Sequence, residues 1–338
     1  MAATVSQPFD FLCATRIVAG PGTADRVGRV VASFGARRAL VLADPEILTS
    51  GRATALATSL DQSGVGIVST VEMAAGIEAG DAVQTALARA GADVILTIGG
   101  DPVFEATERV PASMPVVGVP TVASSGAGQA QCRAVVLDPE LSVDVADPVA
   151  RAAAITAIAR AVESWVTANR NPLSDVFARE AWRALAVSYL EATSGASDLD
   201  ALGGLLLGAF LADVAASQSG LGALDACARP IARRARVGHG PALAMLLPEV
   251  VRWNARVVAD RYAELASVGG QARRPETLIA RLEDFVAAGG FPERLGAAGI
   301  PERELPALAA MAAAEPSASS NPRKFDVAGA LELYAATY

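Results

Sequence analysis

The first half of the chain alternates short apolar runs with amphipathic helical spacing. Four apolar runs indicate strands, at residues 39–44, 65–71, 93–100 and 115–121, and those at 39–44 and 93–100 indicate buried strands. The stretch 79–92 has the spacing of a helix that covers them. Strands that alternate with crossover helices predict a parallel, doubly wound sheet. Ligands of such sheets bind beyond the carboxyl ends of the strands, so we expect Asp44 and residues 99–102 and 120–129 around one crevice.

From about residue 150 to the end, the apolar positions recur with helical spacing only. The spacing predicts helices over 150–168, 172–192, 202–217, 241–268 and 275–289. The sequences PLSD at 172–175 and RPET at 274–277 are typical helix starts, and 314–326 predicts a loop. We therefore predict a Rossmann-like α/β domain over 1–148 and an all-helical domain over 149–338, with a ligand cleft between them.

Composition narrows the function classes. The chain has 338 residues, a net charge of −8 and almost no lysine, so a nucleic-acid partner is not expected. The cysteines Cys13, Cys132 and Cys227 are too far apart for a disulfide framework or a thiolate zinc site, and we interpret them as core residues. No signal peptide or membrane span is evident, which predicts a cytoplasmic protein without a membrane partner.

The only histidine, His239, follows a run of arginines. Its GHG setting predicts a tight loop, and its imidazole is the one side chain suited by its ordinary pKa to proton transfer near neutrality. It is either a catalytic base or a former metal ligand. The run is Arg229, Arg233, Arg234 and Arg236. It is either a solvated helix end or a docking site for a carboxylate-bearing substrate or an acidic peptide.

Several segments together resemble the iron-containing alcohol dehydrogenase superfamily, within it the maleylacetate-reductase branch. They are RIVAGPGTADRVG (16–28), VVLDPELSVDV (135–145), AIARAVESWVTANRNPLSD (157–175), GHGPALAMLLPEVVRWNA (238–255) and NPRKF (321–325). The resemblance spans essentially the whole chain. It implies the dehydroquinate-synthase-like fold, a parallel-sheet domain followed by a helical one, in an oxidoreductase homologue.

The resemblance also implies where a metal would bind. Metal-dependent members hold a divalent ion with one aspartate and three histidines, and the matching positions here are Thr156, Arg160, Asp225 and His239. A second histidine that follows the third ligand is matched by Arg229. A guanidinium cannot ligate a cation, so we expect no catalytic metal.

The loop that matches the family's pyrophosphate-binding loop also differs from the family in residues that would contact the ligand. The family's Gly-Gly-Gly-Ser is matched by Gly99-Gly100-Asp101-Pro102. A carboxylate replaces the third glycine and repels phosphate, and the proline lacks an N–H group.

Two further elements of the nucleotide site are partly retained. In the second phosphate-side element, residues 121–128, Thr121 and Ser125 keep their hydroxyls. Asp44 stands where the family has an acid near the adenosine ribose. The resemblance therefore implies weakened binding of NAD(P), not its exclusion, and we expect no resident cofactor.

The charged residues at the former metal positions allow three interpretations. Asp225 and Arg229, four apart on a helix, could form a local ion pair. Arg160 could instead fill the vacated volume and pair with Asp225. Alternatively, the arginines could form a cradle for an anionic ligand, with Asp225 orienting them.

Two main functional hypotheses follow. The first is a non-catalytic binding or partner subunit in a homo- or heterodimer. Its partner would be an active homologous dehydrogenase or a client that carries a carboxylate. A bacterial natural-product pathway is one conceivable setting. The second is a metal-independent NAD(P)-dependent oxidoreductase of a small keto or hydroxy acid. There Arg160 or Arg229 would polarise the carbonyl and His239 would relay the proton. A third hypothesis is a lyase or isomerase that uses the same arginines.

Overall fold

The computed structural model describes residues 8–49, 51–73, 79–123, 132–143, 145, 147–194, 198–234, 237–268 and 270–338. The chain divides into two compact units. One unit comprises Cys13–Ala146 and Ser197–Phe210. The other comprises Met1–Leu12, Asp147–Ala196 and Leu211–Tyr338, and helix α9 contributes residues to both.

A parallel sheet forms the centre of the first unit, which confirms the expected fold class. Its strands are β1 (Arg16–Ala19), β2 (Arg38–Ala43), β3 (Gly66–Glu72), β4 (Val94–Gly99), β5 (Val116–Pro120) and β6 (Cys132–Leu137). Their order across the sheet is β1-β6-β5-β4-β2-β3, and every pairing is parallel. The chain changes direction across the sheet between β2 and β4, which is where such sheets bind ligands.

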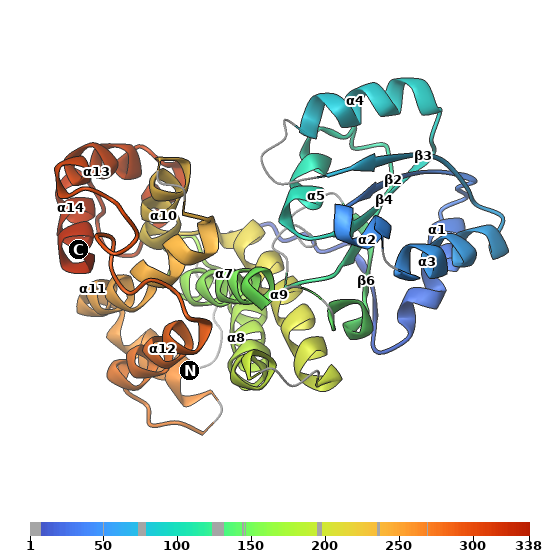
Figure 1. Cartoon of the computed structure of the whole chain (residues 1–338). Coiled ribbons are helices and arrows are strands. Elements are labelled where there is room, and N and C mark those ends of the chain that lie inside the picture. Colours follow the sequence, from blue (N-terminus) through green and yellow to red (C-terminus); the bar gives the residue numbers. More distant parts are fainter. Residues whose placement is uncertain are drawn as a thin grey trace. The chain divides into compact units, whose positions relative to one another are not determined.

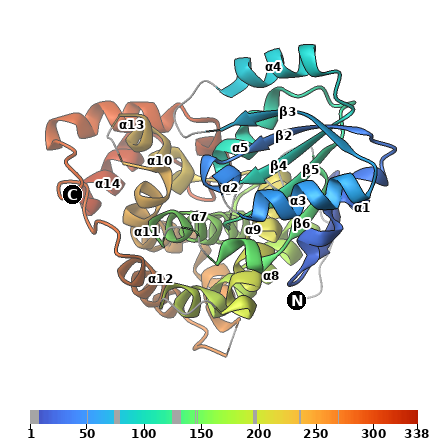
Figure 2. The same ribbon diagram turned by 45° about the vertical axis from the view of Figure 1, so that its right-hand side comes forward.

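Helices flank this sheet, as Figure 1 and Figure 2 show. They are α1 (Val27–Ala32), α2 (Pro45–Thr49), α3 (Gly51–Gln62), α4 (Ala79–Ala90) and α5 (Asp101–Glu105), with 3-10 turns at Thr23–Arg26, Ala106–Arg109 and Pro139–Ser142. Strand β4 is buried along its whole length, in keeping with its mainly apolar sequence, and its one polar side chain, Thr97, donates to the Val117 carbonyl of β5.

The other unit is helical. Its helices are α7 (Asp147–Val166), α8 (Pro172–Thr193), the second half of α9 (Leu199–Ser219), α10 (Ala223–Arg234), α11 (His239–Ser267), α12 (Pro275–Gly289), α13 (Leu305–Ala313) and α14 (Val327–Thr337). The five expected helices are confirmed. The expected loop at 314–326 contains a 3-10 turn at Pro316–Ser320, and another turn spans Glu302–Glu304.

Helix α9 is long and apolar enough, by length and composition, to cross a membrane. Most of it is buried inside the structure, as expected of a core helix in a globular protein. It also carries a buried carboxylate, Asp213, that makes an ion pair within the helical unit.

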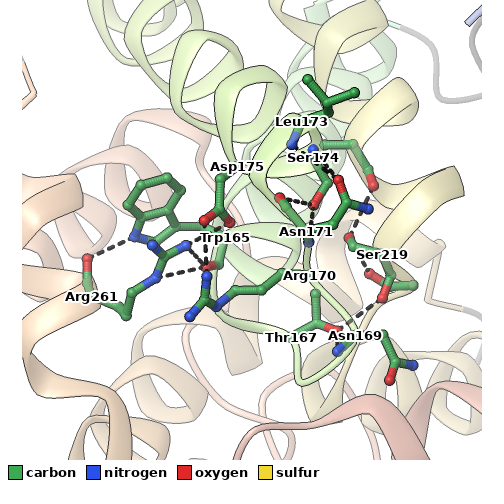
Figure 3. Close-up of polar contacts among 12 residues, drawn as sticks. Trp165, Thr167, Asn169, Arg170, Asn171, Leu173, Ser174, Asp175, Ser219 and Arg261 are labelled. Carbon is green, nitrogen blue, oxygen red and sulfur yellow. Dashed lines mark hydrogen bonds and ion pairs between the residues drawn. The ribbon is translucent and has the colours of Figure 1, made fainter. Parts of the chain in front are cut away.

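The turn between α7 and α8 is fixed by a stacked arginine (Figure 3). The Arg261 guanidinium lies 3.6 Å from the centre of the Trp165 ring and donates to the Trp165 carbonyl and to Asp175. The Trp165 indole N–H donates to the Arg261 carbonyl at 2.7 Å. Asn171 then caps α8 by accepting hydrogen bonds from the N–H groups of Leu173 and Ser174. The ends of α7 and α11 and the start of α8 are thereby joined.

The cysteines lie only partly where expected. Cys132 and Cys227 are buried, as the sequence predicts. The interpretation of Cys13 as a core residue is wrong, because this side chain is exposed. Burial raises the pKa of the Cys132 thiol to about 12, so it is inert at neutral pH.

Candidate functional site

Helices α7, α10 and α11 carry Thr156, Arg160, Asp225 and His239, the four positions at which the resemblance predicts metal ligands, and α11 packs against both α7 and α10 (Figure 2). Helix α11 approaches α7 so closely that a Cβ on Gly240 would stand 2.5 Å from the carbonyl oxygen of Ala152. The Thr156 hydroxyl donates to the same carbonyl at 2.8 Å. Thr156 and His239 therefore belong to neighbouring turns of packed helices.

The structure corrects the setting of His239. It is the first residue of α11, with Gly238 as the N-cap, so the expectation of a tight loop is wrong. The two glycines beside His239 have different structural roles. Gly238 is the N-cap of α11, and Gly240 permits the close contact with α7.

Arg160, which is largely but not fully buried, makes an ion pair with the buried Asp213 of α9. The guanidinium Nη1 lies 2.6 Å from the Asp213 carboxylate oxygen, and the two side chains are 12% and 1% exposed. The expected pair between Arg160 and Asp225 is therefore wrong, since among the described residues Asp213 is the carboxylate partner of Arg160. Asp213 was missed, although one acid within an otherwise apolar helical run is itself a signal of a buried ion pair.

Asp225 lies between Arg229 and His239. One carboxylate oxygen accepts from Arg229 Nε at 2.8 Å, and the other lies 3.8 Å from His239 Nε2. The local ion pair four residues apart on a helix is thus confirmed. The Asp225 side chain is 4% exposed, whereas Arg229 and His239 are 45% and 33% exposed.

A second residue that the sequence did not single out, Glu163, fixes the start of α10. One of its carboxylate oxygens accepts from the N–H groups of Gly222 and Leu224, and the other accepts from the N–H of Asp225. The N–H groups in the first turn of a helix have no acceptor within the helix. Here the buried Glu163 side chain supplies the acceptors. Glu163 therefore sets the position from which the Asp225 side chain projects.

The pKa of Glu163 is raised to about 8. Burial is the main cause, the Asp225 carboxylate adds to it, and the three N–H donors oppose it. Because the folded-state pKa exceeds the ordinary value of 4.5, the folded protein holds this proton more tightly than the unfolded chain. The resulting stabilisation is complete below about pH 4.5 and is lost as pH rises through about 8.

We expect the free energy of unfolding to decrease as pH rises from about 5 to 8.5, a window that follows from the raised pKa of Glu163. Urea denaturation at several pH values measures this slope. The variant Glu163→Gln, which cannot titrate, should show a shallower slope over the same range. Equal slopes would contradict the assignment of this titration to Glu163.

The arginines that follow Asp225 have acidic partners. Arg233 pairs with Glu315 at 2.5 Å, and Arg234 lies 3.6 Å from Glu304. Arg236 lies outside the described residues. Both arginines remain more than half exposed in these pairs, at 56% and 53%, so a docking role for the run stays a prediction.

The residues present do not fit a divalent metal as the family holds it. Arg160 carries a fixed positive charge, and the Thr156 hydroxyl donates to its own helix. Asp225 and His239 are the two remaining donors. Within the part of the chain that the structure describes, no three His, Cys, Asp or Glu side chains gather as a metal site.

In the α/β unit, the carboxyl ends of β2, β4 and β5 bring Asp44 and the Gly99–Gly100 turn together, as expected. The Asp44 carboxylate accepts a hydrogen bond from the Gly100 N–H at 2.7 Å. Gly99 has a φ of 148°, and a Cβ there would stand 2.4 Å from the same carboxylate. Thr121, at the end of β5, donates its N–H to the Gly99 carbonyl at 3.1 Å. Ser125 lies outside the described residues.

This turn does not fit a pyrophosphate in the family's manner. The Gly100 N–H group is already bonded to a carboxylate from within the chain. Burial raises the pKa of Asp44, the Gly100 hydrogen bond lowers it, and the nearby carboxylates of Glu46 and Asp101 raise it further. Asp101 and Pro102 begin α5. A dinucleotide phosphate would have to displace Asp44 and face Asp101.

Comparison with known proteins places the whole chain in one family. Residues 14–157 match Iron-containing alcohol dehydrogenase, and residues 151–338 match Fe-containing alcohol dehydrogenase family, C-terminal. The chain is 26% identical to a long-chain-alcohol dehydrogenase of Geobacillus thermodenitrificans over 86% of both proteins. It is 27% identical to a maleylacetate reductase of a Rhizobium species over 92% of both.

The fold is shared with solved structures. A 1,3-propanediol oxidoreductase superposes with a TM-score of 0.90 at 22% identity, over 98% of this chain and 100% of that one. The resemblance noted in the sequence is thus confirmed for both halves. The chain belongs to the iron-containing alcohol dehydrogenase family.

Proposed function

We propose that this family member does not perform metal-dependent hydride transfer and acts as a non-catalytic binding or partner subunit in the cytoplasm. The observation that carries the proposal is the buried ion pair between Arg160 and Asp213. It puts a permanent positive charge at a position that a metal ligand would need, and a buried carboxylate balances that charge.

The nucleotide turn supports the same proposal independently. In the α/β unit, the Asp44 carboxylate bonds the Gly100 N–H that a phosphate would need. Metal-dependent hydride transfer needs both a metal site and a nucleotide site. At the first position Arg160 pairs with Asp213, and at the second the Gly100 N–H group donates to Asp44, so groups of the chain itself take the place of both ligands. The simplest function compatible with both is one that uses the surfaces of the fold, for example toward an active homologous dehydrogenase or a carboxylate-bearing client.

The test measures the metal content of the purified protein and its affinity for NADH and NADPH. We expect the purified protein to contain no stoichiometric iron or zinc by elemental analysis. In titrations followed by nicotinamide fluorescence, we expect NADH and NADPH to bind with a Kd above about 1 mM, which is weaker than about −4 kcal/mol. Micromolar binding of either dinucleotide would overturn the proposal in favour of a metal-independent NAD(P)-dependent oxidoreductase.

A rebuilt variant tests whether the four positions are in register with the family's ligands. Thr156→Asp, Arg160→His and Asp225→His restore the ligand types. The structure adds Asp213→Ala to this set, because Asp213 would otherwise lose its partner inside the helical unit. We expect the fourfold variant to bind zinc, measured by calorimetry, and the matched Asp213→Ala variant not to bind it. Absence of binding by a folded fourfold variant would contradict the assignment of these positions.

A further inference from the structure

Six exposed arginines lie at the end of the parallel sheet where its strands begin. They come from the starts of β1, β2 and β6 and from the last turns of α1 and α4, the helices that lead into β2 and β4. We name them the strand-start arginines: Arg16, Arg29, Arg37, Arg38, Arg89 and Arg133. Because all the strand pairings are parallel, these positions share one end of the sheet, opposite to the end that carries Asp44 and the Gly99–Gly100 turn.

Three of these arginines form one group at the starts of β1 and β6. Arg16 Nη1 donates to the Ser33 hydroxyl at 3.3 Å, and Ser33 lies one helical turn after Arg29. In the sheet, Arg16 is in register with Ala134, the residue that follows Arg133. The register and the hydrogen bond therefore place these three guanidinium groups on neighbouring elements.

The other three form a second group at the start of β2. Arg38 Nη2 donates to the Ala90 carbonyl at 2.7 Å, so it lies beside Arg89 at the end of α4. Arg37 directly precedes Arg38 in the chain. Strand β2 is four positions from β1 in the sheet, about 19 Å at the usual spacing of strands. The two groups therefore span a width that suits a contact with a protein surface.

The strand-start arginines carry charge that the described part of the chain does not pair. Their side-chain hydrogen bonds go to the Ser33 hydroxyl and to the carbonyl groups of Gly64 and Ala90, and none of the six forms an ion pair with a described carboxylate. In the helical unit, by contrast, Arg233 and Arg252 have carboxylate partners.

Acidic residues at this end of the sheet do not balance the arginines. Asp93 begins the chain segment of β4 and accepts from the backbone N–H groups of Arg37 and Arg38, and Asp61 lies in the last turn of α3. The six arginines outnumber these two carboxylates. A positive surface therefore stands on a chain whose net charge is −8, and such a surface attracts an anionic partner.

The chemistry of this surface favours a protein as that partner. Phe34, in the turn that leads from α1 to β2, is 37% exposed between the two groups. Arginine and aromatic side chains are the residues that contribute most to protein–protein contacts, and a guanidinium makes two-pronged contacts with carboxylates. A nucleic acid is a long polyanion, so the net charge of the whole chain opposes its binding.

We propose that the strand-start arginines and Phe34 form a docking surface for a different protein, one that presents a cluster of aspartate and glutamate side chains. The surface lies at the opposite end of the sheet from the nucleotide turn. The inference does not depend on whether metal or dinucleotide binds, and its test involves neither ligand, so it can fail separately from the proposed function.

Charge reversal within the first group tests the surface. The probe is a fluorescein-labelled peptide of about twelve glutamates, titrated with the full chain in about 50 mM NaCl and followed by fluorescence anisotropy. We expect a Kd on the order of 10 μM. The variant Arg29→Glu with Arg133→Glu should bind at least about ten-fold more weakly. The variant Arg29→Lys with Arg133→Lys keeps both charges and should stay within about three-fold of the unmodified chain.

The matched control is Arg273→Glu with Arg303→Glu, the same change of charge on two exposed arginines of the helical unit. It should bind the peptide within about two-fold of the unmodified chain, and circular dichroism should show all variants folded. The proposal is overturned if the unmodified chain does not bind the peptide, or if the two charge-reversal variants lose the same affinity. Tighter binding of a DNA duplex of about 20 base pairs than of the peptide, at the same salt concentration, would overturn it in favour of a nucleic-acid partner.

Discussion

Replacing Glu163 with alanine should lower the free energy of unfolding by about 3–5 kcal/mol. The substitution leaves the N–H groups of Gly222, Leu224 and Asp225 without their acceptor inside the helical unit. Each unsatisfied buried donor costs about 1–3 kcal/mol, and partial access of water reduces the sum. Urea denaturation followed by circular dichroism measures the change.

The control is Glu302→Ala, because Glu302 is an exposed glutamate that begins a 3-10 turn. Exposed substitutions of this kind stay within about 0.5 kcal/mol. If Glu163→Ala were as stable as this control, the capping role of Glu163 would be refuted. Asn321, which accepts from the Ala223 N–H at 3.0 Å, is unchanged in both variants.

The second large effect concerns the buried ion pair. We expect Arg160→Ala or Asp213→Ala to destabilise the protein by about 3–5 kcal/mol, because each leaves an opposite charge buried without its partner. The double variant Arg160→Leu with Asp213→Ala should recover most of the loss, since removing both charges also removes their cost of desolvation. A double-mutant cycle measures the coupling.

Arg229 and Asp225 provide the matched comparison. Arg229 is 45% exposed, so Arg229→Ala removes an ion pair that is largely in water. Its loss should cost less than about 1 kcal/mol. Similar effects for Arg160→Ala and Arg229→Ala would show that burial does not distinguish the two pairs. That result would also count against the proposal that a buried carboxylate holds the Arg160 charge in place.

The sheet was predictable where its strands carry long apolar runs, and this includes the edge strand β3, which is not buried on both faces. Strands β2, β4 and β5 have mainly apolar sequences, and the sequence places all three. Strand β1 has four residues and lies at the edge of the sheet, with Ile17 42% exposed, so it lacks a buried run. Strand β6 begins with Cys132 and an exposed Arg133, which shortens its apolar pattern.

The contacts among the residues that the sequence singled out were not predictable. The sequence identifies Arg160, Asp225 and His239, and the structure puts their helices together. It could not identify the partner of Arg160, because Asp213 is 53 residues away and the pairing depends on how α7 meets α9. The glycines beside His239 suggested a loop, yet one caps a helix and the other permits close packing.

The buried pair of Arg160 and Asp213 also restricts how the sequence can change over evolutionary time. A lineage that replaces either residue first must pass through an intermediate with one uncompensated charge in its interior. The cost of that intermediate, about 3–5 kcal/mol, is a large part of the 5–15 kcal/mol by which a typical domain is stable. We therefore expect substitutions at this pair to be tolerated when both residues are exchanged at once and not when one is exchanged alone.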